Sequence, residues 1–124
     1  MADRVKITAG ETVVYATLNG TQTARKIFEA LPIEARGQTW GDEIYFGIPV
    51  DCDSENPRPT VEVGDLGYWE PGSAFCIFFG PTPMSVGDEI VPADPVTVFG
   101  KVDGDATVLR AFKGGAKVRV EKAE

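Results

Sequence analysis

GDLGYWEPGSAFCIFFGPTP, residues 64–83, is the stretch of sequence that decides the fold of this chain. Its apolar run from Phe75 to Phe79 gives neither face of a strand a polar position, so neither face can meet water without a large cost in free energy. The Gly-Pro-Thr-Pro run that follows ends the strand, because proline lacks the N–H group that a sheet ladder needs. We therefore predict a central strand that is covered on both faces.

Length, composition and charge limit the domain count and the classes of partner. With 124 residues and 43% hydrophobic content, the chain is long enough for one hydrophobic core and too short for two, so we expect a single domain over residues 1–124. Its net charge of −7 disfavours nucleic acid and anionic membrane surfaces as partners. No apolar leader follows the first charges, and no segment approaches the ~18 apolar residues that cross a bilayer. We expect a cytoplasmic protein.

The chain contains no histidine, and this excludes several kinds of site. Ser-His and Cys-His nucleophile pairs, a histidine general base and histidine-bearing zinc sites all require an imidazole. Acid or base chemistry is left to a carboxylate with a raised pKa, a lysine with a lowered one, a tyrosine or Cys76. We expect no cofactor and no metal site.

The two cysteines match no metal or redox motif by their spacing. Cys52 falls in a polar loop and Cys76 in the central strand. We interpret them as one surface thiol and one buried thiol, and a disulfide between them stays open as the alternative.

The loop DCDSENPRPTVE, residues 51–62, resembles a calcium-binding loop in part. Asp51, Asp53 and Glu55 alternate, and Glu62 stands at the twelfth position. The template then fails, because Asn56 replaces the required turn glycine and two prolines stiffen the part that must wrap the ion. We interpret this segment as a charged, solvated loop near a barrel rim.

The remaining pattern predicts one helix and about eight strands. Residues 5–7 and 12–18 predict a β-hairpin, and an apolar stripe at helical spacing runs from Ala24 to Leu31, where Pro32 ends it. The other predicted strands cover 44–50, 61–68, 75–79, 96–102, 107–112 and 117–121. We predict an all-β fold, a closed eight-stranded antiparallel barrel with one or two capping helices, because closure removes exposed sheet edges. A two-sheet sandwich is the alternative.

Three segments in the same order resemble the first helix, the core strand and the FGKV strand of cyclophilins. They are TARKIFEAL (23–31), SAFCIFFG (73–80) and VTVFGKVDGD (96–105). Through WGDEIYF (40–46), GDLGYW (64–69), IFFGPTP (77–83) and PVTVFGKV (95–102), the chain is more closely similar to a small group of uncharacterised bacterial and archaeal cyclophilin-like proteins. The resemblance implies a cyclophilin-like barrel capped by one or two helices, and no particular activity.

The sequence departs from cyclophilins in the residues of their prolyl isomerase site. Their catalytic arginine precedes a GFMxQGGD string that is absent between Ile33 and Val50, where Arg36 is the one basic candidate. Ala74 lies in the region of their site glutamine, and the histidine that opens their FGKV strand is replaced near Val96. An isomerase stabilises the twisted amide with a positioned donor or cation, so whether this chain is an enzyme stays open.

The aromatic residues predict a surface groove, because the set is too large for a barrel of this size to bury entirely inside. Indole N–H and phenol O–H groups suit an apolar groove with a few polar handles. Glu43 lies among these rings, and an apolar wall there could raise its pKa. Rings that merely fill the barrel and a solvated Glu43 are the alternatives. The predicted ligand-binding residues are Trp40, Glu43, Tyr45, Trp69, Phe79 and Thr82.

The groove leads to the functional prediction. We predict that the protein binds a small molecule or a short peptide there, and that residues 84–94 form a loop long enough to be a lid. A weak peptidyl-prolyl isomerase and an interaction module that forms a homodimer through exposed aromatics are the alternatives.

Overall fold

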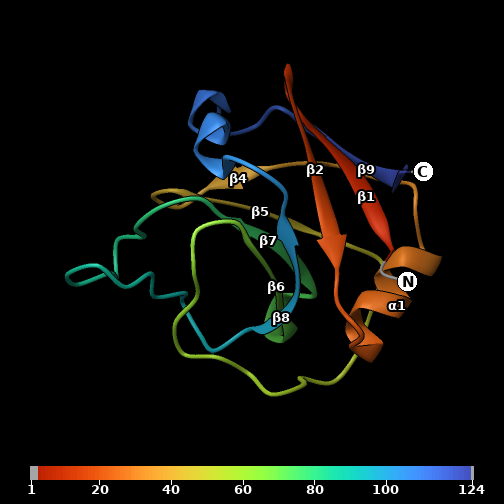
Figure 1. The fold of residues 1–124 in the computed structure, drawn as a ribbon, viewed down its shortest axis with the longest axis horizontal. Helices are drawn as coiled ribbons and strands as arrows, with labels where there is room; N and C mark the ends of the chain where they lie inside the picture. The colour runs from red at the N-terminus through yellow and green to blue at the C-terminus, as the bar shows by residue number, and fades with distance from the viewer. Residues whose placement is uncertain (1–2, 124) are drawn as a thin grey trace.

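The computed structural model describes residues 3–123. These residues form nine strands, one α-helix and two short 3₁₀ helices, and Figure 1 shows the strands wound around a common centre. The strands are β1 (Arg4–Ala9), β2 (Thr12–Leu18), β3 (Ile33–Arg36), β4 (Gln38–Thr39), β5 (Glu43–Gly47), β6 (Asp65–Trp69), β7 (Ala74–Phe78), β8 (Thr97–Val102) and β9 (Lys117–Ala123). The helices are α1 (Gln22–Glu29), η1 (Glu70–Gly72) and η2 (Ala106–Ala111).

The strands form a nearly closed antiparallel barrel, which confirms the predicted fold. Their order is β3-β9-β1-β2-β8-β6-β7-β5-β4. The two end strands, β3 and β4, follow each other in the chain with Gly37 alone between them, and they pair with β9 and β5 respectively. One extended run therefore bridges the two ends of the sheet. Neither β3 nor β4 was predicted, and one of the eight predicted strands is a helix, so nine strands are present.

Gly37 lies where this run crosses between the two halves of the barrel. Its N–H donates to the Ala116 carbonyl at 2.9 Å, and its own carbonyl accepts from the N–H of Gly115 at 2.7 Å. A Cβ atom at position 37 would lie 2.8 Å from a methyl carbon of Val118 and 3.0 Å from the ring of Phe112. Only glycine lets the chain pass this close to the core without displacing its neighbours.

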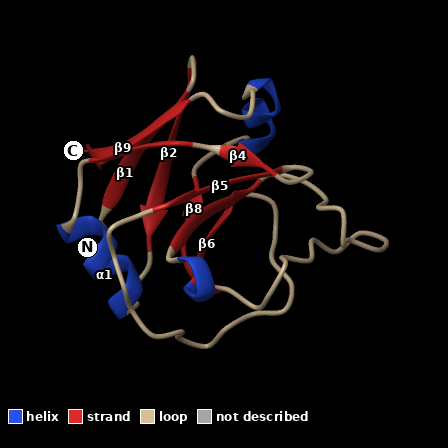
Figure 2. Cartoon of the chain, turned by 180° about the vertical axis from the view of Figure 1, so that it is seen from behind, coloured by secondary structure: helices blue, strands red, loops and turns tan. Residues whose placement is uncertain are grey.

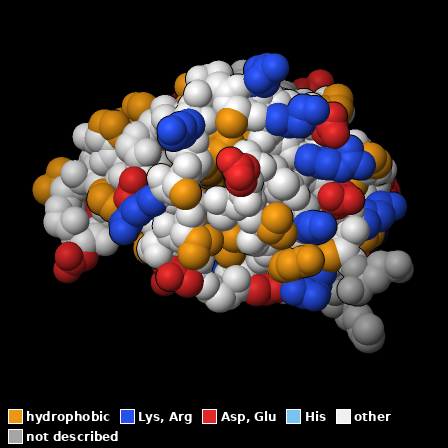
Figure 3. All heavy atoms as spheres, turned by 90° about the horizontal axis from the view of Figure 1, so that it is seen from above, with side chains coloured by type: hydrophobic (Ala, Val, Ile, Leu, Met, Phe, Trp, Pro, Cys, Tyr) orange, Lys and Arg blue, Asp and Glu red, His pale blue; other side chains and the backbone are white. Residues whose placement is uncertain are grey.

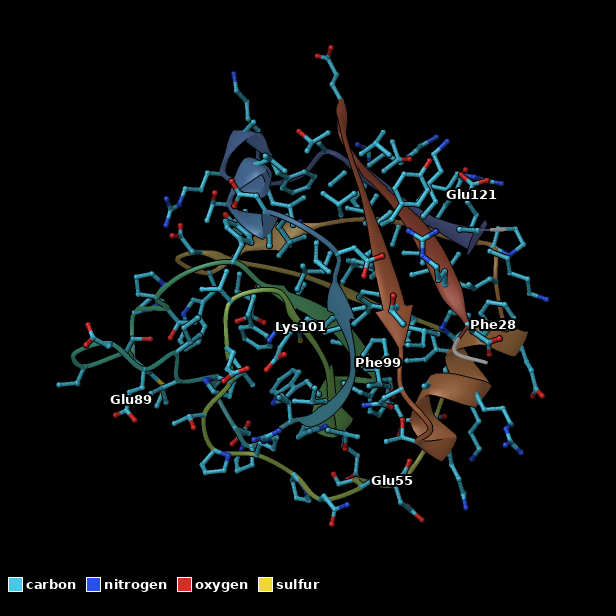
Figure 4. All side chains as sticks on the ribbon, in the orientation of Figure 1. Phe28, Glu55, Glu89, Phe99, Lys101 and Glu121 are labelled. Carbon is cyan, nitrogen blue, oxygen red and sulfur yellow. The ribbon has the colours of Figure 1, made fainter. Side chains whose placement is uncertain are left out.

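Phe75 occupies the middle of the core, as the sequence predicted for its strand. β7 pairs with β5 on one side and β6 on the other. The Phe75 ring stacks on Phe46 with centroids 5.0 Å apart and meets Phe99 edge to face at 5.0 Å. Phe99 is labelled in Figure 4. Such aromatic pairs add to the free energy gained from burial alone.

The helix α1 covers one end of the barrel, and η2 lies at the opposite end (Figures 1 and 2). Thr21 caps α1, since its hydroxyl accepts a hydrogen bond from the N–H of Ala24 at 3.0 Å. Ala24 and Ile27 lie buried against the core, as their spacing predicted. No helix among residues 3–123 is long and apolar enough to cross a membrane.

The predicted strand over 107–112 is wrong, because this segment forms the 3₁₀ helix η2. The Asp105 carboxylate accepts hydrogen bonds from the N–H and the hydroxyl of Thr107, at 2.9 and 2.5 Å, and so starts a helical turn. Leu109 is buried while Val108 is exposed. The apolar pattern that predicted a strand therefore reflects residues on the inner side of a helical turn.

The predicted strand over 61–68 begins later than expected, at Asp65. Val61 forms a single bridge with Ile90, in which its N–H donates to the Ile90 carbonyl at 3.0 Å. Val63 is exposed. The segment before β6 is therefore a covering loop, which Figure 2 shows as part of the long connections outside the barrel.

Charged side chains of both signs lie together on the outer surface of the barrel, as Figure 3 shows for one face. Glu34 on β3 pairs with Arg119 at 2.5 Å and lies 3.9 Å from the Lys117 amine, and Arg119 also approaches Glu121 at 3.5 Å. These pairs are solvent-exposed, so each adds little to stability.

Candidate functional site

The outer face of the sheet around β7 carries a second apolar cluster. Phe75 and Ile77 belong to the core inside the barrel, whereas the alternate residues of β7 belong to the outer cluster, and all of them are buried. The outer cluster consists of Val61, Ala74, Cys76, Phe78, Ile90 and Val96, with Trp69 and Val98 packed against it. The prediction that both faces of this strand are covered is confirmed.

A cavity of about 260 Å³ opens beside this outer cluster. Its walls come from the end of β4, from β5, β6 and β7, and from the loop that precedes β8. The residues that line it are Trp40, Glu43, Tyr45, Trp69, Cys76, Pro92, Ala93 and Val96. Four of the six residues predicted to bind a ligand thus meet in one concave surface.

The turn between β4 and β5 holds Trp40 in place. The Trp40 N–H donates to the Glu43 carbonyl at 3.0 Å, and Gly41 adopts a left-handed conformation with φ of 61°. A Cβ atom at Gly41 would lie 2.8 Å from Pro83 and 2.9 Å from the Pro81 carbonyl oxygen. The turn therefore packs tightly against the segment after β7, which fixes the position of the indole.

Trp69, at the end of β6, is anchored from two sides. Its indole N–H donates to the Asp94 carboxylate at 2.8 Å. The ring lies over Gly72, where a Cβ atom would come within 2.6 Å of it. The indole is thus held as one wall of the cavity, and an acidic group lies at its polar edge.

Glu43 is the buried acidic group of the cavity, with 6% of its surface exposed. Burial raises its pKa to about 7, and a hydrogen bond from the Cys76 thiol opposes that shift. The carboxyl is therefore close to half ionised at neutral pH. Its position confirms that the strand places Glu43 on the side opposite Ile44, which is in the core.

Cys76 lies beside Glu43 and is also buried. Burial, the charge of Glu43 and their hydrogen bond all raise the pKa of the Cys76 thiol. The sulfur therefore stays protonated at neutral pH and is a poor nucleophile. Cys52 is likewise a free cysteine, so no disulfide joins the two. What the pair offers a ligand is one carboxyl group that can donate or accept a proton near neutral pH.

Phe79 and Thr82 lie apart from the cavity lining. Phe79 is 3% exposed and belongs to the core inside the barrel. Thr82 is buried in the loop after β7, where its hydroxyl donates to the Val91 carbonyl and its N–H donates to the Ser85 hydroxyl at 2.9 Å. Phe79 therefore packs in the core, and Thr82 stabilises its loop through hydrogen bonds.

Sequence reasoning missed half of the lining residues. Cys76 alternates with Ile77 and pairs in register with Tyr45, so strand periodicity places it on the outer face once the pairing is known. Pro92, Ala93 and Val96 come from an irregular segment. No periodicity marks which residues of such a segment turn inward.

The loop over 84–94 divides into two parts. At its base, the Ser85 hydroxyl accepts from the N–H of Val91 at 3.1 Å, and these bonds hold the loop closed on itself. Its tip projects away from the barrel, where Met84 and Val86 are exposed and Glu89 is seen in Figure 4. Only the later residues 92 and 93 reach the cavity, so whether the tip acts as a lid stays a prediction.

Arg36 lies on β3, where its guanidinium donates to the Gly115 carbonyl at 3.0 Å, and it is outside the cavity lining.

The acidic residues of the 51–62 loop bind different partners and do not converge on one point. Asp51 accepts from the Ser73 hydroxyl at 2.6 Å, Glu55 caps α1, and Glu62 pairs with Lys101 at 2.9 Å. Within residues 3–123, no group of three or more acidic or thiol side chains is arranged to hold a metal.

A second, polar hollow of about 310 Å³ lies on the side of α1. It is lined by Lys26, Asp51, Cys52, Asp53, Tyr68 and Glu70. Two of its acidic groups are engaged locally, since Glu70 accepts from the hydroxyl of Ser54 at 2.5 Å and Asp51 from the hydroxyl of Ser73 at 2.6 Å. The Tyr68 hydroxyl donates to the Val50 carbonyl at 2.7 Å. These contacts stabilise the loop after β5.

Comparison with known proteins supports the fold across the whole barrel. A family model described as "Cyclophilin-like" matches residues 3–121. The solution structure of a hypothetical protein from Archaeoglobus fulgidus is similar, with 38% sequence identity and a TM-score of 0.83, over 98% of this chain and 95% of that one. None of the curated proteins matches this chain.

Proposed function

Because this chain belongs to the cyclophilin-like family, whose fold by itself fixes no activity, we propose that it binds a small molecule or a short peptide segment in its outer cavity. The observation that carries the proposal is the meeting of Trp40, Tyr45 and Trp69 around one buried carboxyl group. A mostly apolar hollow with a few polar groups is the usual form of a ligand site.

The size of the cavity limits the ligand. Its volume of about 260 Å³ lies near the lower end of the range for small-molecule sites, roughly 300–1,000 Å³. A compact metabolite or one side chain of a peptide fits such a volume. The proposal therefore concerns a single small group inserted between the aromatic rings.

Intrinsic fluorescence reports on this site directly, because Trp40 and Trp69 are the two tryptophans of the chain. Both line the cavity. A metabolite library is screened by thermal shift, and each hit is titrated while tryptophan emission is followed. A ligand that binds only the folded protein raises its melting temperature.

Two tyrosine variants test whether a hit uses the cavity. Tyr45 and Tyr15 are both exposed tyrosines on strands, at 36% and 40%, but only Tyr45 lines the cavity. Tyr45→Ala should weaken binding of the hit, and Tyr15→Ala should leave it unchanged. A library that yields no hit, or hits that bind equally to both variants, would contradict the proposed function.

A further inference from the structure

We propose that the cavity is built for an organic cation, a small methylated amine whose nitrogen carries few N–H groups, with the Glu43 carboxylate as its counter-ion and the aromatic rings as its walls. This inference rests on the proposed function and names the chemistry of the ligand. The same chemistry occurs in a free amine and in a methylated amine side chain of a peptide.

The first step concerns the partners of the buried acids. Two carboxylates are buried among residues 3–123, Glu43 and Asp65, and each is 6% exposed. Asp65 accepts a hydrogen bond from the N–H of Glu62 at 2.8 Å and lies 3.7 Å from the Lys101 amine. Glu43 has no such ion pair in the described part of the chain, and the Cys76 thiol is the one hydrogen-bonding group acting on it. A buried carboxylate without a cation beside it is costly in free energy, so a cationic ligand would supply the positive charge that Glu43 lacks.

The second step concerns the walls. Trp40, Tyr45 and Trp69 all line the same hollow as Glu43. The face of an aromatic ring carries partial negative charge and attracts a cation within about 6 Å of its centre. The Asp94 carboxylate, which accepts from the Trp69 indole, adds negative charge at the edge of that wall. The rings and the two carboxylates therefore favour the same sign of ligand charge.

The third step concerns the number of N–H groups. A primary ammonium has three donors, and each one buried without an acceptor is costly. Besides Glu43, only the Tyr45 hydroxyl among the lining side chains can accept a hydrogen bond well, and the others are apolar or, like the indoles and the Cys76 thiol, mainly donors. An ammonium with one N–H group or none needs few acceptors, so it suits a lining that offers few, and its methyl groups can pack against the rings. Methylated nitrogen is thus preferred over primary amine.

The pH dependence separates this proposal from a neutral ligand. The groups that face Glu43 are the Cys76 thiol from β7, the Tyr45 phenol from its own strand, and Asp94 through Trp69. Because the pKa of Glu43 is about 7, its ionised fraction and the affinity for a permanent cation should rise about tenfold from pH 6 to pH 8. A neutral ligand that accepts a hydrogen bond from the protonated carboxyl would show the opposite trend.

The experiment titrates five butyl probes and follows tryptophan emission and calorimetric heat. The probes are butyltrimethylammonium, N,N-dimethylbutylamine, butylamine, 1-butanol and butyrate. We expect the two methylated cations to bind at least about tenfold more tightly than 1-butanol. The affinity of butylamine should lie between that of the methylated cations and that of 1-butanol, and butyrate should show no binding. A peptide with dimethyllysine, beside the same peptide with lysine, distinguishes a peptide ligand from a free amine.

Two variants that each remove one negative charge complete the test. Glu43→Gln should abolish the preference for cations and its rise with pH, while 1-butanol binding is retained. Asp88→Asn, in the exposed loop tip, is the charge-matched control and should behave as the unaltered protein. Equal affinity for butyltrimethylammonium and 1-butanol, or a cation preference that survives Glu43→Gln, overturns this inference and leaves the proposed function standing. Failure of every probe overturns the inference, and with an empty library screen it also overturns the proposed function.

Discussion

The Glu55 carboxylate accepts hydrogen bonds from both the backbone N–H and the hydroxyl of Thr23, at 2.8 and 2.9 Å. Its other oxygen accepts from the N–H of Gln22 at 3.2 Å, so a loop residue satisfies the free N–H groups at the start of α1. The backbone N–H of Glu55 in turn donates to the Thr97 hydroxyl at 2.8 Å. Figure 4 shows Glu55 beside α1. The loop after β5 is thereby tied to the helix and to β8.

Glu55→Ala should destabilise the protein by about 1 kcal/mol at neutral pH, as the loss of a helix cap usually does. Hydrogen bonds from Thr23 are the main cause that lowers the pKa of Glu55. A carboxylate with a lowered pKa stabilises the fold above its unfolded pKa of 4.5, and this contribution is lost as the pH falls through the folded value.

The measurement is urea unfolding of Glu55→Ala at pH 7 and pH 3, with Glu89→Ala in the exposed loop tip as the control. The difference in unfolding free energy between Glu55→Ala and the unaltered protein should be smaller at pH 3 than at pH 7, because below pH 4.5 the unfolded chain takes up a proton at Glu55 more readily than the folded state does. The capping role would be refuted if Glu89→Ala lost as much stability as Glu55→Ala at pH 7.

Glu43→Gln should make the protein more stable above pH 7. The pKa of Glu43 rises from 4.5 to about 7 on folding. Between pH 4.5 and pH 7, the carboxyl group therefore stays mostly protonated in the native state while it is mostly ionised in the unfolded chain. Stability therefore falls as the pH rises from 4.5 to 7 and is level above it. The gain from the glutamine should approach on the order of 3 kcal/mol at pH 8 and vanish near pH 4.5. Thermal melts across this range, beside Asp88→Asn, measure it, and a pH-independent gain would contradict the assignment.

The sequence was sufficient to predict the barrel because its strongest patterns are set by burial. The unbroken apolar run of β7 requires cover on both sides, and the stripe from Ala24 to Ile27 requires a helix against the core. These patterns survive in the structure because the hydrophobic term dominates folding. At 107–112 an apolar pattern was misread as a strand, since a local hydrogen bond from the Thr107 N–H to the Asp105 carboxylate decided the backbone there.

The site was predictable only in part. Trp40, Glu43, Tyr45 and Trp69 stood out by their chemistry, and the outer cavity unites them. Phe79 lies in the core and outside the cavity lining. The sequence did not indicate this, because a strand covered on both faces gives no sign of which side is the interior. The choice depends on pairing with β5, which lies far from β7 in the sequence, as well as with the neighbouring β6. Pro92 and Ala93 depend on the path of an irregular loop, for which no periodicity exists.

Tyr68→Phe should lower the unfolding free energy by about 1–3 kcal/mol, because it leaves the buried Val50 carbonyl without its donor. The Tyr68 hydroxyl donates to that carbonyl at 2.7 Å, and the tyrosine is 1% exposed. Tyr15→Phe is the matched control, since Tyr15 is 40% exposed on β2. Chemical denaturation compares the two. Equal stabilities would mean that water replaces the lost donor at Val50.

Gly37→Ala tests the closure of the barrel. The added methyl would lie 2.8 Å from Val118, 3.0 Å from Phe112 and 3.1 Å from Ile44, all of which are core residues. Overpacking of this kind costs about 1–3 kcal/mol, because the neighbours must leave their preferred rotamers.

Gly47→Ala is its control, since Gly47 ends β5 and a Cβ there meets nothing within 4 Å. Chemical denaturation should show Gly37→Ala less stable and Gly47→Ala unchanged or slightly more stable. Amide exchange should locate the loss, with faster exchange in β3, β4 and their partners β9 and β5 than in the β6–β7 pair, because the strain enters where the two ends of the sheet meet. Uniformly faster exchange across all strands would mean that closure at Gly37 is no separate element of the fold.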